Sequence, residues 1–180
     1  MSIEFNGSSD ELSSEYYEHN KSICGAFEKF CCQKGGSPKG TYNAWSYNAV
    51  AEINDWRIKI NKATYSSGNL LIPSNTQSLL VNSVWINQNY LKSDDSFKIY
   101  SKWKVGFMKR LLGGFSELSG YKGYWIKGDS ALSNEFVTRF SSEFASGDVH
   151  SIEYNGKGIR IEFHSEDLHL ESLDQIIIGK

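Results

Sequence analysis

The sequence has few cysteines, few prolines and no long apolar run. Cys24, Cys31 and Cys32 are odd in number and include an adjacent pair, which argues against a secreted disulfide framework. The first residues have neither the basic nor the apolar region of a signal peptide, and no apolar run approaches the roughly 18 residues of a membrane span. Two prolines and 14% aromatic residues in a chain of 180 are typical of packed chains. We expect a soluble, cytoplasmic globular protein.

Linear motifs of catalysis and nucleotide binding are missing as well. The chain has no Gly-x-Ser-x-Gly elbow, no Ser-x-x-Lys with its partner motifs, no Gly-x-Gly-x-x-Gly and no Walker-type loop. The cysteines do not supply the two closely spaced pairs that zinc sites usually use, so we expect them to pack as small apolar side chains. We therefore assign no catalytic residue, no cofactor and no metal, and favour a non-enzymatic protein.

Charge is distributed unevenly along the chain, although the net charge is only −2. Residues 1–33 hold six acids and two bases, residues 34–127 hold thirteen bases and five acids, and residues 128–180 hold ten acids and four bases. The three segments therefore carry −4, +8 and −6. Either the acidic ends fold back over the basic middle, which we favour, or the basic middle forms a binding face.

The segment 98–127 is the most distinctive, because it combines seven bases with aromatic side chains and contains a single acid, Glu117. Its part 102–112 is amphipathic. One interpretation, which we favour, buries Val105, Met108, Leu111 and Leu112 in the core and leaves the lysines in solvent. In the other interpretation the segment is a docking surface for a protein or for an anionic membrane surface. Nucleic acid is the least favoured of the possible partners. The predicted partner-binding residues are Lys98, Lys102, Trp103, Lys104, Phe107, Lys109, Arg110, Lys122, Trp125 and Lys127.

Histidines offer an alternative site near the C-terminus. If Phe163 faces the core, then Glu162, His164 and His169 share the opposite face, and two imidazoles with a carboxylate could bind a divalent metal ion. We favour a solvated turn over a metal site here, because the sequence shows no buried groups that would orient these ligands.

Two helices are predicted. The first covers about 11–33 after N-caps at Ser9 or Asp10. The second covers about 131–145, capped by Asp129 or Ser130 and ended by Gly147. The apolar stripe expected on the first helix is Leu12, Tyr16, Ile23, Phe27 and Phe30. We expect an N-terminal helix at 1–34, a Gly-rich joint at 35–40 and an α+β body at 41–180, in a single domain overall.

Alternating apolar residues predict a mostly antiparallel sheet of about six to eight strands, so the expected fold class is α+β. Residues 42–53 fit a strand, with a helix as the alternative, and the Asn155-Gly156 turn predicts a hairpin between 149–154 and 159–163. A turn is predicted at 66–69 and a short helix at 103–112. The ending 172–178 fits a helical turn or a last strand. The other predicted strands are 56–60, 70–72, 77–86, 96–101, 121–127 and 168–170.

A resemblance begins at Asp55-Trp56-Arg57-Ile58-Lys59-Ile60 and continues through Leu111-Leu112-Gly113 and Trp125-Ile126-Lys127-Gly128-Asp129. These features, over about residues 55–175, are similar to a group of uncharacterised bacterial proteins of unknown function, often tethered by membrane helices. The acidic-Phe pair usual after the Gly-Asp turn is missing here. The resemblance implies a bacterial origin and no site residues.

Three hypotheses for function remain open. The leading one is a non-enzymatic protein-interaction module, of the bacterial immunity or antitoxin type or an accessory protein. The second is a peripheral membrane-surface protein that uses segment 102–112. The third is an enzyme without a linear motif, with a metal site at Glu162, His164 and His169.

Overall fold

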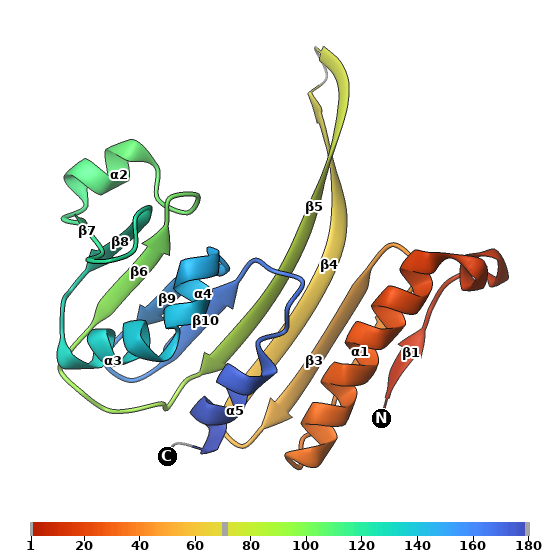
Figure 1. The fold of residues 1–180 in the computed structure, drawn as a ribbon, viewed down its shortest axis with the longest axis horizontal. Coiled ribbons are helices and arrows are strands. Elements are labelled where there is room, and N and C mark those ends of the chain that lie inside the picture. Colours follow the sequence, from red (N-terminus) through yellow and green to blue (C-terminus); the bar gives the residue numbers. More distant parts are fainter. Residues whose placement is uncertain (1, 70–71, 179–180) are drawn as a thin grey trace. The chain divides into compact units, whose positions relative to one another are not determined.

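The computed structural model describes the backbone of residues 2–69 and 72–178, without the side chains of 65–69, 72–78, 107 and 109. The described chain is α+β, as predicted (Figure 1). Its strands are β1 (Ile3–Phe5), β2 (Lys39–Tyr42), β3 (Tyr47–Ile53), β4 (Trp56–Asn69), β5 (Ile72–Asn87), β6 (Phe97–Ser101), β7 (Ser116–Glu117), β8 (Tyr124–Lys127), β9 (Val149–Tyr154) and β10 (Ile159–Phe163). Its helices are the 3-10 helix η1 (Ser9–Ser13) and the α-helices α1 (Glu15–Gln33), α2 (Phe107–Leu112), α3 (Ala131–Arg139), α4 (Ser141–Ser146) and α5 (Leu170–Ile178).

The chain forms two compact units. Unit 1 comprises Met1–Ser83 and Ser165–Leu170, and unit 2 comprises Val84–His164 and Glu171–Lys180. The strand order is β1-β2-β3-β4-β5 in unit 1 and β5-β10-β9-β6-β8-β7 in unit 2, so the strand β5 contains the boundary. This boundary does not coincide with the division expected at 35–40. The pair β1–β2 is parallel, and the other pairs with a described register are antiparallel.

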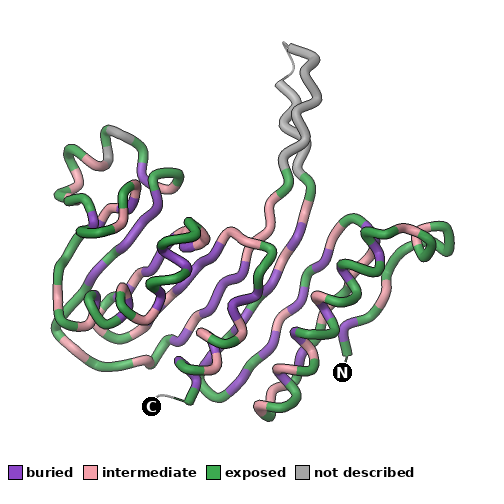
Figure 2. Tube along the Cα trace, viewed as in Figure 1, coloured by how far each residue is buried: buried purple, intermediate pink, exposed green. Residues whose placement is uncertain are grey.

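In unit 1, α1 lies along β3 (Figure 1). The strand β3 alternates between buried and more exposed residues, with Tyr47, Ala49, Ala51 and Ile53 buried (Figure 2). The strand predicted at 42–53 is therefore confirmed for 47–53, whereas Tyr42 ends β2 and 43–46 connect the two strands. The expected joint is in part a strand, because β2 begins at Lys39.

The predicted helix at 11–33 is wrong in two details. Ser14 adopts an extended conformation that separates η1 from α1, and its Oγ accepts a hydrogen bond from the backbone N–H of Tyr16. The expected apolar stripe is also displaced, since Leu12 and Tyr16 are exposed. The buried residues follow one another at spacings of three and four, which is the spacing of one helix face. They are Tyr17, Asn20, Cys24, Phe27 and Cys31. Packing of Cys24 and Cys31 is thus confirmed, whereas Cys32 is exposed.

Glu11 ties η1 to the turn before β3. Its Oε2 accepts a hydrogen bond from Ala44 N (3.0 Å) and its Oε1 accepts one from Ser8 N (3.2 Å). The bond from Ala44, followed by that from Ser8, lowers the pKa of Glu11 from its ordinary value of 4.5. A carboxyl group whose pKa is lower in the folded state stabilises the fold above its unfolded pKa, and this contribution is lost as the pH falls through the folded pKa.

We therefore expect Glu11→Gln to lower the melting temperature at neutral pH and to lower it less and less as the pH falls below about 4.5. The measurement is thermal unfolding of both proteins across a pH series. A difference in melting temperature that stays constant from neutral to acid pH would contradict this role of the carboxylate.

In unit 2, α3 and α4 cover one face of the sheet (Figure 1). The helix predicted at 131–145 is broken at Phe140, which has a φ of −102° and a ψ of 28° and separates α3 from α4. Ser130 caps α3 and Gly147, with a φ of 88°, ends α4, as the sequence indicates. An aromatic core joins the helices to the strands. Its rings are Trp85, Phe97, Phe136, Phe140 and Phe163.

Several strand predictions need correction. The described chain has ten strands rather than six to eight, because the short strands β1, β2 and β7 carry too few residues for a visible alternation. The turn predicted at 66–69 lies within β4, and the strand predicted at 70–72 falls partly on residues outside the description. The strand predicted at 168–170 is absent, since α5 begins at Leu170. The hairpin of β9 and β10 is confirmed, with Gly156 at a φ of 88°.

Candidate functional site

The sheet of unit 2 has a polar face on the side away from its aromatic core. Strand register places Glu162, Ser151, Tyr100 and Trp125 in one row across β10, β9, β6 and β8. A second row consists of Arg160, Glu153, Lys98 and Lys127. Because successive side chains of a strand alternate between faces, Glu162 and His164 point to this side while Phe163 between them is buried in the core.

His150 reaches the same face through a β-bulge. The pairing runs from Glu162 with Ser151 directly to Phe163 with Val149, so His150 is an extra residue in β9. In a regular strand His150 would point away from its neighbour Ser151, but a bulge bends the strand and changes the direction of a side chain. As a result the rings of His150 and His164 stack with centroids 3.6 Å apart and planes 6° apart.

Glu162 completes a cluster with these two histidines. Its Oε1 lies 3.2 Å from His164 Nε2, and one ligand atom from each of His150, Glu162 and His164 lies within 4.8 Å of the others. This is the one group of three or more potential metal ligands found in the part of the chain that the structure describes. We call these three residues the His–Glu cluster.

Two cations flank the His–Glu cluster. Lys104 follows β6, and its Nζ lies 3.4 Å from Glu162 Oε2, 3.4 Å from Glu153 Oε1 and 2.9 Å from Ser151 Oγ. Arg160, two residues before Glu162 on β10, donates to the same Oε2 at 3.1 Å. The two oxygens of Glu162 therefore have different roles, because Oε2 binds the cations and Oε1 faces His164.

These contacts set the protonation of the cluster. The hydrogen bond from His164 lowers the pKa of Glu162 far below its usual range, and Lys104 and Arg160 add to this against the opposing effect of burial. Burial lowers the pKa of His150 to about 4, and the neighbouring His164 ring is the next cause. Lys104 and Arg160 lower this pKa a little further, whereas Glu162 raises it. At neutral pH the cluster contains a carboxylate and a neutral His150.

The metal-ligand set suggested by the sequence is therefore wrong in one member. Glu162 and His164 come together as expected, but His169 follows the end of β10 in unit 1 and is not part of the cluster. His150 takes its place. Alternation in β9 assigns His150 to the opposite face, and the one signal that could have identified it, a bulge, depends on the pairing of two strands.

The predicted partner-binding residues differ in their surroundings. Lys104 forms ion pairs within the protein, and the guanidinium of Arg110 lies 5.0 Å from the ring of Trp125. The side chains of Phe107 and Lys109 lie outside the description. Lys102 stacks on Trp103, with its Nζ 4.9 Å from the ring. The remaining three lysines, Lys98, Lys122 and Lys127, are exposed.

Exposed apolar side chains surround α2. Val105 is buried as predicted, but Met108, Leu111 and Leu112 are not, and their exposed fractions are 64%, 66% and 81%. Trp103 is 81% exposed. The favoured interpretation of the sequence, with these residues in the core, is therefore wrong for all but Val105. The helix is six residues long instead of the expected ten, which leaves its apolar side chains without a buried face.

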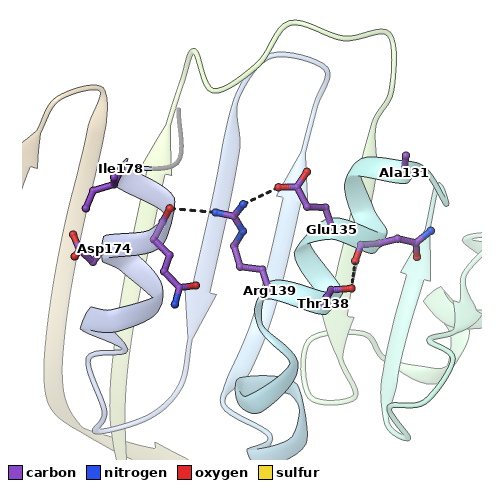
Figure 3. A pocket seen from close by; sticks show the side chains of 8 residues that line it. Ala131, Glu135, Thr138, Arg139, Asp174 and Ile178 are labelled. Carbon is purple, nitrogen blue, oxygen red and sulfur yellow. Dashed lines mark hydrogen bonds and ion pairs between the residues drawn. The ribbon is translucent and has the colours of Figure 1, made fainter.

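An open groove of about 780 Å³ lies between α3 and α5 of unit 2 (Figure 3). Arg139 crosses it, donating to Glu135 Oε1 at 2.8 Å and to the carbonyl of Gln175 at 3.3 Å. The guanidinium of Arg139 is therefore bound by two other residues that line the groove. The lining residues are Ala131, Asn134, Glu135, Thr138, Arg139, Asp174, Gln175 and Ile178. None of the lining residues is a histidine or a cysteine, so the groove offers fewer potential metal ligands than the polar face of the sheet.

In comparisons with known proteins, no family model and no curated protein matches the chain. The resemblance noted in the sequence stays a prediction. Among the described residues, no helix has both the length and the apolar composition that crossing a membrane requires.

Proposed function

We propose that this protein is a binding module that docks an acidic protein partner through the segment around α2. The observation that carries the proposal is the exposure of four large apolar side chains within ten residues. We call this region the α2 surface, and it consists of Lys102, Trp103, Met108, Arg110, Leu111 and Leu112. Groups of large exposed apolar side chains mark interaction sites in many proteins, and burying such side chains against a partner gains about 25 cal/mol for each Å² of apolar surface.

Charge and residue type favour an acidic protein as the occupant. Lys98, Lys122 and Lys127 add positive charge along the segment 98–127, whose single acid is Glu117. An acidic partner would approach faster through this field and would bind more weakly in salt. Trp103 and Arg110 belong to the residue types that contribute most to protein interfaces. The immunity, antitoxin or accessory role inferred from the sequence is the biological setting of this proposal.

The experiment is affinity capture by the full chain from a lysate of the source organism, followed by purification of the captured partner and measurement of its dissociation constant. We expect Trp103→Ala to weaken binding by at least about tenfold, because truncating a central tryptophan typically costs 2 kcal/mol or more. The matched control is Leu91→Ser, which changes an exposed leucine of the same unit outside the α2 surface.

The proposal requires an acidic partner, binding that weakens with added salt, and an effect of Trp103→Ala that Leu91→Ser does not reproduce. Equal affinities of the wild type and Trp103→Ala would rule out the α2 surface as the docking site. A basic partner, or one insensitive to salt, would contradict the electrostatic part of the proposal.

A membrane surface is the second candidate occupant, and one observation favours it. Leucines and a tryptophan exposed beside lysines are the composition of a segment that inserts shallowly among anionic lipids. Flotation with vesicles of phosphatidylserine and phosphatidylcholine tests this candidate. Retention by anionic vesicles that is lost in Trp103→Ala, together with no captured protein, would make the membrane the occupant in place of a protein.

A further inference from the structure

We infer that His150, Glu162 and His164 bind one divalent transition-metal ion of the zinc class. Each residue presents a nitrogen or oxygen ligand atom, and the three atoms lie within 4.8 Å of one another. The inference is independent of the α2 surface, because it rests on the polar face of the sheet and needs no partner.

The backbone supports this assignment. Glu162 lies on β10 and His164 comes directly after its last residue, Phe163. The backbone N–H of His164 donates to the carbonyl of Asp148 at 2.9 Å, so the pairing and the alternation continue to His164 and place both side chains on one face. His150 joins them because the bulge in β9 makes it an extra residue opposite the Glu162–Phe163 step. The pairing of β9 with β10 and the bond from His164 N to Asp148 O thus hold the backbones of all three ligands, so that only side-chain torsions remain to be set when an ion binds.

The ligand types select the class of ion. Two imidazoles and one carboxylate suit zinc and its neighbours in the transition series, whereas calcium and magnesium prefer sites made of oxygen atoms alone. Ligand atoms around one tetrahedral zinc ion lie about 3.4 Å apart, so side-chain rotations must bring the farthest atoms up to about 1.4 Å closer. These rotations must also turn the two imidazole rings out of their parallel stack, because the lone pair of each ring nitrogen lies in the plane of its ring. Three protein ligands leave a fourth position for water, and the His164 side chain, 33% exposed, connects the site to solvent.

Lys104 and Arg160 oppose the ion. Both bind Glu162 Oε2, so an ion at Oε1 would lie close to two positive charges. The inference therefore makes a specific prediction. Removing the charge of Lys104 should tighten metal binding, and this would not happen if the cluster served only as an ion-pair network.

The experiment uses the full chain after treatment with a chelator, titrated with Zn²⁺ in a calorimeter and with Co²⁺ by visible absorption. We expect one ion for each chain in the wild type. His150→Ala should weaken Zn²⁺ binding by at least about tenfold. Tenfold is the smallest loss usually seen when a residue that only orients a metal ligand is removed, and His150 is itself a ligand. Lys104→Met should strengthen it severalfold. His169→Ala is the matched control and should leave both the stoichiometry and the affinity unchanged.

Folding is checked by circular dichroism and by melting temperature, which Zn²⁺ should raise in the wild type and not in His150→Ala. His150→Ala is the main variant because it keeps the ion pairs of Glu162, and His164→Ala provides a second test if His150→Ala does not fold. The inference is overturned if the wild type binds no Zn²⁺ more tightly than about millimolar. It also fails if His169→Ala abolishes binding while His150→Ala and His164→Ala retain it, or if Lys104→Met weakens binding.

Discussion

Phe163→Ala is expected to lower the free energy of unfolding by about 3–5 kcal/mol, the usual cost of removing a buried phenylalanine ring. Phe163 is fully buried, and its ring centroid lies 4.7 Å from that of Trp85 and 5.6 Å from that of Phe140. Aromatic pairs at such distances add to the free energy gained by burying apolar area. Because whole domains are stable by only about 5–15 kcal/mol, this single change should remove much of the stability.

The measurement is urea unfolding followed by circular dichroism. Leu112→Ala is the control, because Leu112 is 81% exposed and its truncation should change the free energy of unfolding by less than about 0.5 kcal/mol. A loss below about 1 kcal/mol for Phe163→Ala would mean that the aromatic core of unit 2 is not packed as described.

Asn20→Ala should have the second-largest effect, a loss of about 3 kcal/mol. Asn20 is fully buried in unit 1, and its Nδ2 donates to the carbonyls of Asn43 (2.9 Å) and Ala44 (3.1 Å). Its Oδ1 accepts a hydrogen bond from the buried ammonium of Lys62 at 3.2 Å. Alanine removes all three bonds and leaves the Lys62 ammonium paired with Glu166, whose side chain is about half exposed.

A double-mutant cycle in urea unfolding tests this explanation. The loss in Asn20→Ala/Lys62→Met should be smaller than the sum of the single losses by about 1 kcal/mol or more, because the ammonium no longer needs a partner. Asn48→Ala serves as the control, since the Asn48 side chain is exposed and its contact with Asn61 is long, at 3.5 Å. Strictly additive losses would show that Asn20 and Lys62 do not depend on each other.

The predictions that succeeded depend on neighbouring residues. The Asn155-Gly156 turn predicted the β9–β10 hairpin for local reasons. Gly156 adopts the positive φ that the turn requires, and the side chain of Asn155 accepts hydrogen bonds from the backbone N–H groups of Lys157 and Gly158. The cap of α3 at Ser130 was predicted for a similar reason, since its side chain bonds to a backbone N–H three residues ahead.

The predictions that failed concern the direction in which side chains face. Tyr16 and Tyr17 are equally apolar, and only the packing of α1 against β1 and β2, where Tyr17 meets Phe5 and Tyr42, decides that Tyr17 is buried and Tyr16 is not. Met108, Leu111 and Leu112 are apolar residues that were predicted to be buried and are exposed. Their spacing is that of a buried helix face, yet α2 is too short to present such a face to the sheet.

The candidate metal site shows the same division. Glu162 and His164 share a face because alternation in a strand is a local property, and the sequence predicts it. His150 joins them only because β9 pairs with β10 through a bulge, and pairing is a contact between distant segments.

The sequence by itself determined the α+β class, the β9–β10 hairpin, the cap at the start of α3 and the glycine that ends α4, because backbone preferences and side-chain alternation act within a few residues. Only the tertiary structure decided which apolar residues around α2 stay in solvent and which histidine stands beside Glu162. Both depend on strand pairing and on the space that other segments occupy, and neither is encoded in the spacing of neighbouring residues.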